Sequence, residues 1–233
     1  MFSFWQFRYN TNSYGNTNQI TKTINVVSYD EINIVGSMDV DLVAGKEGII
    51  TITAPSNILP YIKVESQNNV LQIYSDQWKN FGFNVQFGNN NRTLVTVPFE
   101  TLTRIKLTGS GKVVSQNPIV SEKLIINCLG SGDVNLAVEA NNLESNTSGS
   151  GDVKLEGKAT NFVSTVFGSG SVEATNLEAQ NAKVSISGSG DVKLWVIQSL
   201  EANTFGSGSI LYKGNPLPNN IKVSGSGEIK KMN

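Results

Sequence analysis

The stretch "CLGSGDVNLAV" (residues 128–138) places a Gly-Ser-Gly triplet and a charged residue inside a sequence that otherwise alternates like a β-strand. The same triplet, followed by any residue and then valine or isoleucine, recurs through the C-terminal half of the 233-residue chain. Its copies begin at Gly109, Gly130, Gly149, Gly168, Gly188, Gly206 and Gly225, so successive starts lie 18 to 21 residues apart. This spacing identifies an internal repeat with a period of about nineteen residues.

The residues around each triplet alternate between apolar and polar side chains. The position four residues after the first glycine is always valine or isoleucine, and the position two before it is mostly apolar. The odd offsets mostly carry Asn, Lys, Glu, Asp or Ser, although Phe167 and Phe205 are exceptions. A period of two predicts strands with one buried face. Because the alternation keeps its phase through the triplet, we expect both glycines to point inward and the serine outward.

These patterns predict an all-β fold, a right-handed parallel β-helix or solenoid with one coil per repeat. Nineteen extended residues have a contour of about 60 Å, which matches two strands of about 20 Å joined by two edges that span sheets about 10 Å apart. We expect the glycines to have a structural role at one sharp edge, where only a hydrogen atom fits between the walls. These glycines are Gly109, Gly111, Gly130, Gly132, Gly149, Gly151, Gly168, Gly170, Gly188, Gly190, Gly206, Gly208, Gly225 and Gly227.

The chain divides into three predicted parts. Residues 1–19 are polar and rich in asparagine, and we expect a flexible or edge-packed arm there. Residues 20–100 alternate in longer units and contain a predicted hairpin and a degenerate triplet, "GSMDV", at Gly36. We expect an irregular β-rich cap that covers one end of the regular solenoid of residues 101–233. The Asn- and Gly-rich segments opposite the triplets are predicted to be turns.

Composition removes several classes of function. The chain has no histidine and a single cysteine, Cys128, which excludes an internal disulfide, His- or Cys-based metal sites and a Ser-His-Asp triad. Eighteen basic and 19 acidic residues give a formal net charge of −1, which argues against nucleic-acid binding. No apolar run is long enough for a transmembrane helix, and the first residues lack the pattern of a signal peptide. We therefore expect no enzymatic activity and no cofactor.

Several stretches together resemble one bacterial family. They are the serial "GSGDV" units, "IVGSMDVDLVAG" (residues 34–45) with "ITITAP" (residues 50–55), "VTVPFETLTRIKLTGSG" (residues 95–111) and "LYKGNPLPNNIKVSGSGEIK" (residues 211–230). Over roughly residues 20–230 the chain resembles the putative auto-transporter adhesin, head GIN domain family. The resemblance implies a β-helical fold and an exported protein of the periplasm, outer membrane or cell surface. The family name suggests adhesion, and the resemblance supplies no catalytic residues.

The position three residues after the first glycine forms an outward stripe with several carboxylates. Its acidic members are Asp133, Asp152, Asp191 and Glu228. Carboxylate oxygens are ligands of Ca²⁺, so a calcium- or sugar-binding stripe is one hypothesis. A solvated edge that prevents association of coils with other molecules is the simpler alternative. Because serine interrupts the row and calcium-binding β-rolls have a different period, of about nine residues, we assign no metal.

The aromatic residues suggest two contact surfaces. The least repetitive stretch, "QWKNFGFNVQFGNNN" (residues 77–91), carries Trp78, Phe81, Phe83 and Phe87. An exposed aromatic loop would suit a sugar or protein partner, whereas a hairpin packed on the solenoid end is the structural alternative. Phe167 and Phe205, which point outward in alternate coils, are candidates for a subunit contact. The sequence leaves the oligomeric state open.

The function that follows best is a non-enzymatic exported module for adhesion or scaffolding. Such a module would bind a surface glycan or protein through extended faces rather than in a pocket. The alternatives are a carbohydrate-binding or carbohydrate-processing β-helix, and a purely structural spacer.

Overall fold

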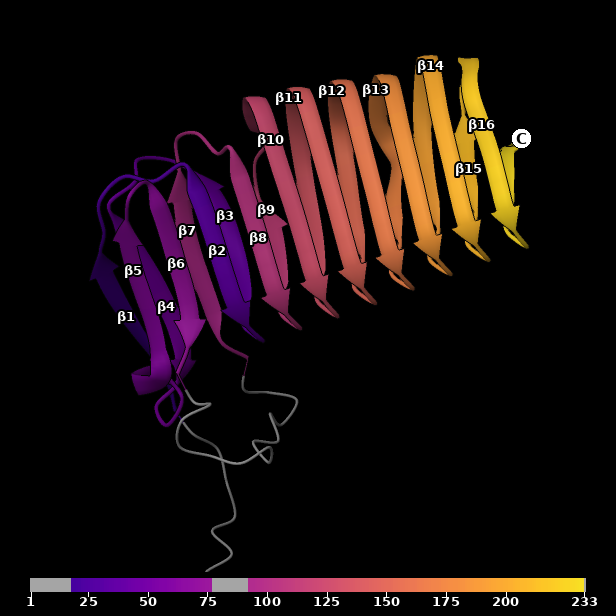
Figure 1. The fold of residues 1–233 in the computed structure, drawn as a ribbon. Coiled ribbons are helices and arrows are strands. Elements are labelled where there is room, and N and C mark those ends of the chain that lie inside the picture. Colours follow the sequence, from indigo (N-terminus) through magenta and orange to yellow (C-terminus); the bar gives the residue numbers. More distant parts are fainter. Residues whose placement is uncertain (1–17, 77–91, 233) are drawn as a thin grey trace, which may run out of the picture.

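The computed structural model describes residues 18–76 and 92–232 as a long stack of β-coils with a more rounded N-terminal end (Figure 1). The described strands belong to one 17-stranded sheet. About seven turns of about nineteen residues form the solenoid, and a nearly closed mixed sheet covers its N-terminal end. The predicted all-β solenoid with a β cap is therefore confirmed. In this part of the chain no helix combines the length and hydrophobicity needed to cross a membrane.

The regular coils use the strands from β8 onward. These are β8 (Arg104–Gly109), β9 (Lys112–Ser115), β10 (Ile119–Gly130), β11 (Asp133–Gly149), β12 (Val153–Gly168), β13 (Val172–Gly188), β14 (Val192–Gly206), β15 (Ile210–Lys213), β16 (Leu217–Gly225) and β17 (Ile229–Lys231). Each coil pairs in parallel with the next so that equivalent positions are neighbours, for example Gly130 with Gly149 and Leu136 with Leu155. The sequence repeat is therefore also the repeat of the hydrogen-bond ladder.

The edge opposite the triplets, which we call the far edge, differs from the expectation of turns. Strands β11 to β14 continue across this edge from one face to the other (Figure 1). Differences in coil length are absorbed by register shifts, such as the one between Ala174 and Glu178 where β13 pairs with β14. A backbone that stays extended keeps its inter-coil hydrogen bonds, whereas a tight turn would interrupt them.

The degenerate triplet at Gly36 forms a coil of the stack. Strands β2 (Glu31–Gly36) and β3 (Asp39–Ala44) pair in parallel with β8 and β9, and Gly36 is the register partner of Gly109. The partners are 73 residues apart in the sequence (109 − 36). The region assigned to the cap from sequence thus contributes one full coil to the solenoid.

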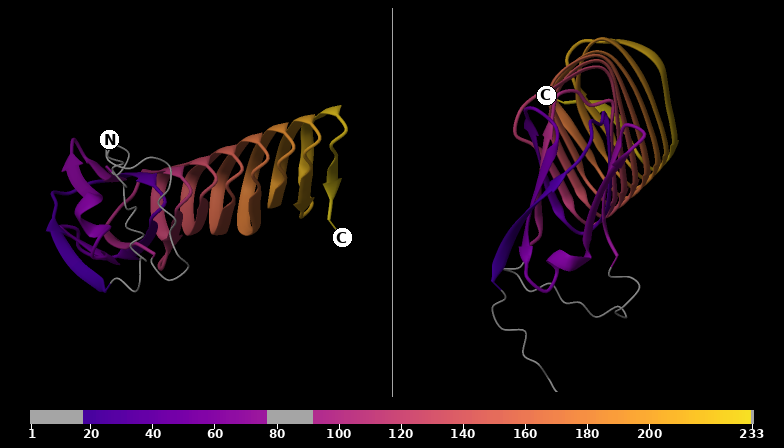
Figure 2. Two further views of the ribbon diagram at one scale, coloured as in Figure 1. Left: turned by 90° about the horizontal axis from the view of Figure 1, so that it is seen from below. Right: turned by 90° about the vertical axis from the view of Figure 1, so that its left-hand side faces the viewer.

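The remaining N-terminal strands close the end of the stack (Figure 2). They are β1 (Gln19–Asn25), β4 (Ile49–Pro55), β5 (Ile62–Gln67), β6 (Val70–Ser75) and β7 (Leu94–Phe99), with a 3-10 turn at Leu59–Tyr61. Strands β6 and β7 continue the two faces in parallel with β2 and β3. Strands β5, β4 and β1 then pair antiparallel with β6, β7 and β4. This change of direction ends the parallel stack and covers its apolar interior.

The core is a continuous column of aliphatic side chains between the two faces, with Phe162 among the largest that are fully buried. Inward hydroxyls interrupt it, among them three near its middle, those of Ser145, Thr147 and Ser164, and Ser145 is the register partner of Ser164. None of the three has a hydrogen-bond partner among the described residues. A buried hydroxyl without a partner costs about 1–3 kcal/mol, so the middle of the solenoid contains a polar defect.

Candidate functional site

The triplet edge is held together by the glycine carbonyls. The carbonyl oxygen of Gly130 accepts hydrogen bonds from the backbone N–H groups of Ser150 at 2.8 Å and Gly151 at 3.0 Å in the next coil. The first glycine has a positive φ, +116° at Gly149, and a Cβ there would lie 2.3 Å from the Gly130 oxygen. A Cβ at Gly151 would lie 2.2 Å from the carbonyl oxygen of Gly132. The glycines therefore allow close approach between successive coils along the stack.

The acidic stripe lies along this edge and is part of its hydrogen bonding. Oδ1 of Asp152 accepts hydrogen bonds from the backbone N–H of Ser171 at 3.0 Å and from its hydroxyl at 2.6 Å. Oδ1 of Asp191 accepts one from the N–H of Ser209 at 2.8 Å. Each of these carboxylates thus links its own coil to a serine in the following coil. Asp133 and Glu228 occupy the equivalent position in their coils, and both are exposed.

The described residues offer no ready metal centre. Within residues 18–76 and 92–232, no group of three or more His, Cys, Asp or Glu side chains is arranged to hold a metal ion. Asp133 and Asp152 are neighbours in the stripe, whereas Ser171 and Ser209 separate Asp152, Asp191 and Glu228 from one another. Their geometry supports a structural use of Asp152 and Asp191.

The far edge carries a polar groove that the sequence analysis did not identify. This far-edge groove is an open depression of about 510 Å³ over β10 to β13. A second depression of about 460 Å³ adjoins it and shares Val120, Ser121 and Glu122. The characteristic residues of the far-edge groove are Glu122, Glu139, Asn141, Lys158, Thr160 and Glu178. Carboxylates, amides, hydroxyls and an ammonium group together suit a polar, hydroxyl-rich ligand.

Register and hydrogen bonds fix the arrangement of the groove. Lys158 of β12 lies between its register partners Glu139 of β11 and Glu178 of β13. The Asn141 side chain donates to Oε2 of Glu122 at 2.5 Å, and the Thr160 hydroxyl bonds to Oδ1 of Asn141 at 3.3 Å. In sequence, the signal was the alternation of charge at equivalent positions of three consecutive repeats.

An asparagine ladder borders the groove and stiffens this edge. The side chain of Asn161 donates to Oδ1 of Asn142 at 3.0 Å, and that of Asn181 donates to Oδ1 of Asn161 at 3.3 Å. The Ser199 hydroxyl donates to Oδ1 of Asn181 at 2.6 Å. Side-chain bonds therefore run parallel to the backbone ladder from one coil to the next.

The aromatic candidates divide into two groups. Trp78, Phe81, Phe83 and Phe87 lie outside the residues that the structure describes. Phe167 and Phe205 are on the outer face made by the C-terminal parts of β12 and β14, where their exposed fractions are 56% and 52%. The structure thus places two large aromatic side chains in solvent on an ordered face.

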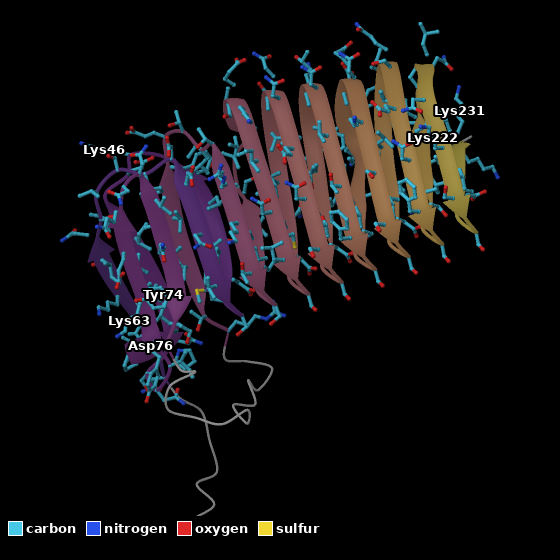
Figure 3. All side chains as sticks on the ribbon, viewed as in Figure 1. Lys46, Lys63, Tyr74, Asp76, Lys222 and Lys231 are labelled. Carbon is cyan, nitrogen blue, oxygen red and sulfur yellow. The ribbon has the colours of Figure 1, made fainter. Side chains whose placement is uncertain are left out.

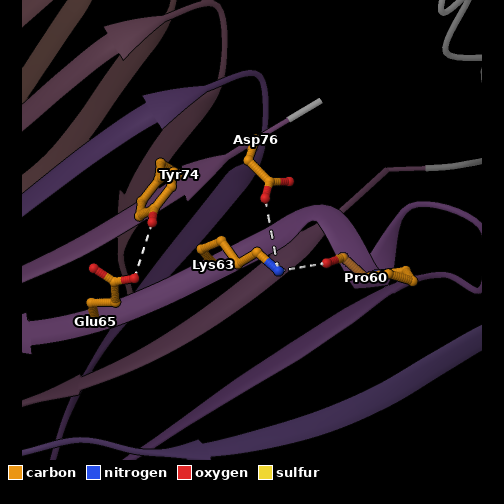
Figure 4. Close-up of polar contacts among 5 residues, drawn as sticks. All are labelled: Pro60, Lys63, Glu65, Tyr74 and Asp76. Atoms are coloured by element: carbon orange, nitrogen blue, oxygen red, sulfur yellow. Dashed lines mark hydrogen bonds and ion pairs between the residues drawn. The ribbon is translucent and has the colours of Figure 1, made fainter. Parts of the chain in front are cut away.

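Lys63, Tyr74 and Asp76 lie together in the N-terminal part of the molecule (Figure 3). In the cap, Nζ of Lys63 donates to the Pro60 carbonyl at 3.0 Å and lies 3.8 Å from Oδ2 of Asp76. The Tyr74 hydroxyl donates to Oε1 of Glu65 at 3.0 Å, and this bond is the main cause of the raised pKa of Tyr74 (Figure 4). These contacts tie β5 to β6 and are structural.

Two buried side chains, the thiol of Cys128 and the phenol of Tyr29, have strongly raised pKa values. Burial, with smaller effects from Asp133 and Asp152, raises the pKa of the Cys128 thiol to about 11. The Cys128 Sγ lies 3.1 Å from the Gly132 carbonyl oxygen, to which the thiol donates. Burial, and then the charge of Glu47, raises the pKa of Tyr29, whose hydroxyl donates to the Pro98 carbonyl. A neutral thiol in the core is a weak nucleophile, so Cys128 has the character of a packing residue.

Comparison with known proteins relates both the sequence and the fold to one group. The sequence profile of the family described as putative auto-transporter adhesin, head GIN domain, matches residues 28–216. The crystal structure of a putative adhesin from Bacteroides fragilis has a TM-score of 0.84 and 29% identity, and the match covers 93% of this chain and 98% of that chain.

Two structures from Parabacteroides distasonis are also similar. One, a putative lipid binding protein, has a TM-score of 0.72 and 27% identity, and the match covers 94% of this chain and 98% of that chain. The other, a putative adhesin, has a TM-score of 0.69 and 22% identity over the same shares, and shows likeness of fold alone. No curated protein shows significant similarity to the chain.

Proposed function

Because the chain belongs to the family described as putative auto-transporter adhesin, head GIN domain, we propose that it is a non-enzymatic, exported module for adhesion or scaffolding. In this proposal it holds a surface glycan or protein through the outer surface of its solenoid. The observation that carries the proposal is the far-edge groove, an open polar surface repeated over consecutive coils of a hydrogen-bonded stack.

The chemistry of the groove favours attachment over turnover. Lys158 between Glu139 and Glu178 presents donors and acceptors at the spacing of the coils, about 4.8 Å. Repeated polar groups of this kind suit hydrogen bonding to the hydroxyls of an extended glycan or to the backbone of a protein. The chain contains no histidine, the residue that most often transfers protons at neutral pH.

The architecture also favours attachment. Every coil is fixed to its neighbours by backbone bonds, and additional side-chain ladders follow both edges. A preformed surface loses little conformational freedom when a ligand binds, which favours affinity. Export is the part of the proposal that the family name supports, and fractionation of cells expressing the full-length gene tests it.

Binding of the whole chain to glycan arrays and to surface proteins tests the proposed function. We expect saturable binding to a subset of ligands, weakened about tenfold or more by Lys158→Ala because a charge-assisted contact is worth about 1.5–3 kcal/mol. Lys154→Ala is the matched control, since Lys154 is an exposed lysine of the same strand that does not line the groove. A chain that binds no ligand, or that converts a bound glycan into products, contradicts the proposal.

A further inference from the structure

One outer column of side chains on the solenoid alternates between large and small residues. It consists of the residue before the first glycine in six consecutive coils: Leu129, Ser148, Phe167, Ser187, Phe205 and Ser224. Each is the register partner of the next, so the order in sequence is also the order along the stack. We call this column the Phe/Ser stripe.

Along the Phe/Ser stripe, the large side chains protrude and each serine leaves a gap between them. Neighbouring strands are about 4.8 Å apart, so the Cα atoms of Phe167 and Phe205 lie about 9.6 Å apart, with only Ser187 between them. A third aromatic ring placed over Ser187 would lie about 4.8 Å from each phenylalanine, within the range of about 4.5–7 Å that aromatic pairs prefer. The gap therefore fits one ring.

The stripe of a second copy of the chain can place one of its own phenylalanine rings in this gap. Reversing the six positions about a two-fold axis between Phe167 and Ser187 sets every large residue opposite a serine. Phe167 then faces Ser187 of the second copy, Phe205 faces Ser148, and Leu129 faces Ser224. A two-fold interface must be self-complementary in this way. We propose that two copies of this chain associate face to face, with antiparallel solenoid axes, by interlocking their Phe/Ser stripes.

The column beside the stripe is compatible with the same pairing. It consists of Asn127, Asn146, Thr165, Ser185, Asn203 and Lys222. The two-fold axis sets Thr165 opposite Ser185 and Asn146 opposite Asn203, which are hydrogen-bonding partners. The one charged member, Lys222, faces an asparagine, so no like charges meet within this column. The next column outward consists of Ile125, Glu144, Val163, Lys183 and Glu201, and the same axis sets Glu144 opposite Glu201. The proposal therefore requires this column to lie at the solvated rim, where Lys183, which forms an ion pair with Glu201, offsets part of the negative charge.

The size of the surface suits a specific but modest dimer. Six coils rise about 24 Å between the first and the last, and the stripe with its neighbouring columns is about 20 Å wide, counting about 6.8 Å for each step of two residues along a strand. Covering it removes on the order of 500 Å² from each copy, or about 1,000 Å² in total, near the lower limit for specific interfaces. Interlocking aromatic side chains supply the buried anchors that such an interface needs.

Sedimentation analysis of the whole chain over a wide concentration range tests the proposal. We expect a monomer–dimer equilibrium whose dissociation constant rises about tenfold or more in Phe167→Ser. The decisive variant is Ser187→Trp, at an exposed position. It adds apolar surface and yet must weaken the dimer, because it fills the gap that receives the partner's ring. Val120→Ser, which removes a side chain exposed to 65% at the far edge, must leave the dimer unchanged.

Three results would overturn the proposal. They are a chain that remains monomeric at every concentration, a dimer that Phe167→Ser does not weaken, and a dimer that Ser187→Trp strengthens. Circular dichroism melting of each variant confirms that the fold is retained. In the first case, glycan binding that depends on Phe167 would assign the stripe to a ligand. Lys158→Ala should leave dimerisation intact, so the dimer and the proposed adhesion function are separable.

Discussion

The carbonyl oxygen of Gly130 lies 2.3 Å from the position that a Cβ on Gly149 would occupy. This oxygen also accepts a hydrogen bond from the N–H of Ser150, so it cannot move away without breaking the ladder. Any side chain at Gly149 therefore meets the backbone of the preceding coil, in a φ region that L-residues rarely adopt.

Gly149→Ala is thus predicted to destabilise the protein by several kcal/mol, through strain and overpacking of about 1–3 kcal/mol each. Chemical denaturation followed by circular dichroism measures the loss. Ser150→Ala, at the neighbouring exposed residue, should change the free energy of unfolding by about 0.5 kcal/mol or less. Equal losses in the two variants would contradict the backbone-contact explanation.

Two phenylalanines of β12 provide a matched pair for core packing. Phe162 is 1% exposed and Phe167 is 56% exposed. Phe162→Ala should lower the free energy of unfolding by about 3–5 kcal/mol, because it leaves a cavity between the two faces. Phe167→Ala should cost about 0.5 kcal/mol or less when it is measured at a concentration where the chain is monomeric. Comparable losses would show that the described inward and outward faces are incorrect.

Two buried threonines at equivalent positions of their coils differ in hydrogen bonding. The Thr204 hydroxyl donates to the Gly208 carbonyl at 2.9 Å, whereas the Thr147 hydroxyl has no partner among the described residues. Thr204→Val should therefore cost about 1 kcal/mol. Thr147→Val should be neutral or stabilising, because it removes an unsatisfied polar group and keeps the shape. Thermal melting of both variants distinguishes them, and a larger loss at Thr147 would contradict the assignment.

The raised pKa of Cys128 predicts a loss of stability at alkaline pH. The thiol has a pKa of about 11 in the folded protein against an ordinary value of 9.0, so the folded state holds its proton more tightly. The stabilisation is complete below pH 9 and is lost as the pH rises to about 11. Cys128→Val, which copies Val166 of the same column, should flatten this decline in denaturation experiments at a series of pH values. An unchanged slope would exclude the thiol as its source.

The carboxylates of the triplet edge predict the response to calcium. Because Asp152 and Asp191 accept hydrogen bonds from the following coil, we expect millimolar-range calcium to leave the melting temperature unchanged. Asp152→Ala should instead lower stability by about 1 kcal/mol through the lost bonds to Ser171. A melting temperature that rises with calcium and no longer does so in Asp152→Ala would establish a cation site.

The sequence was sufficient for the fold because its two periods are independent and agree. The alternation around Val134 and Val153 gives the buried face, and the interval between Gly130 and Gly149 gives the coil. The sequence could not show that the glycines contact the preceding coil rather than the opposite wall. The alternation of apolar and polar residues distinguishes inward from outward positions, but it contains no information about the backbone angle φ.

Other features depend on contacts that are distant in sequence. The pairing of Gly36 with Gly109 was hidden because the intervening residues also read as strands. The far-edge groove arises where Glu139, Lys158 and Glu178 meet in register, and register shifts of the kind seen in β13 cannot be located from spacing alone. Trp78 and its neighbours were inferred from composition, and they lie outside the described residues.

The long-range pairing of β2 with β8 has a consequence for how the molecule assembles. A ribosome delivers β2 and β3 early, but the strands that extend the stack beyond them arrive only after residue 103. Closing this long loop costs more chain entropy than closing the loop of about nineteen residues between successive later coils. The pairing of β2 with β8 should therefore form after the C-terminal coils have begun to pair, so that the N-terminal coil joins a stack that already exists.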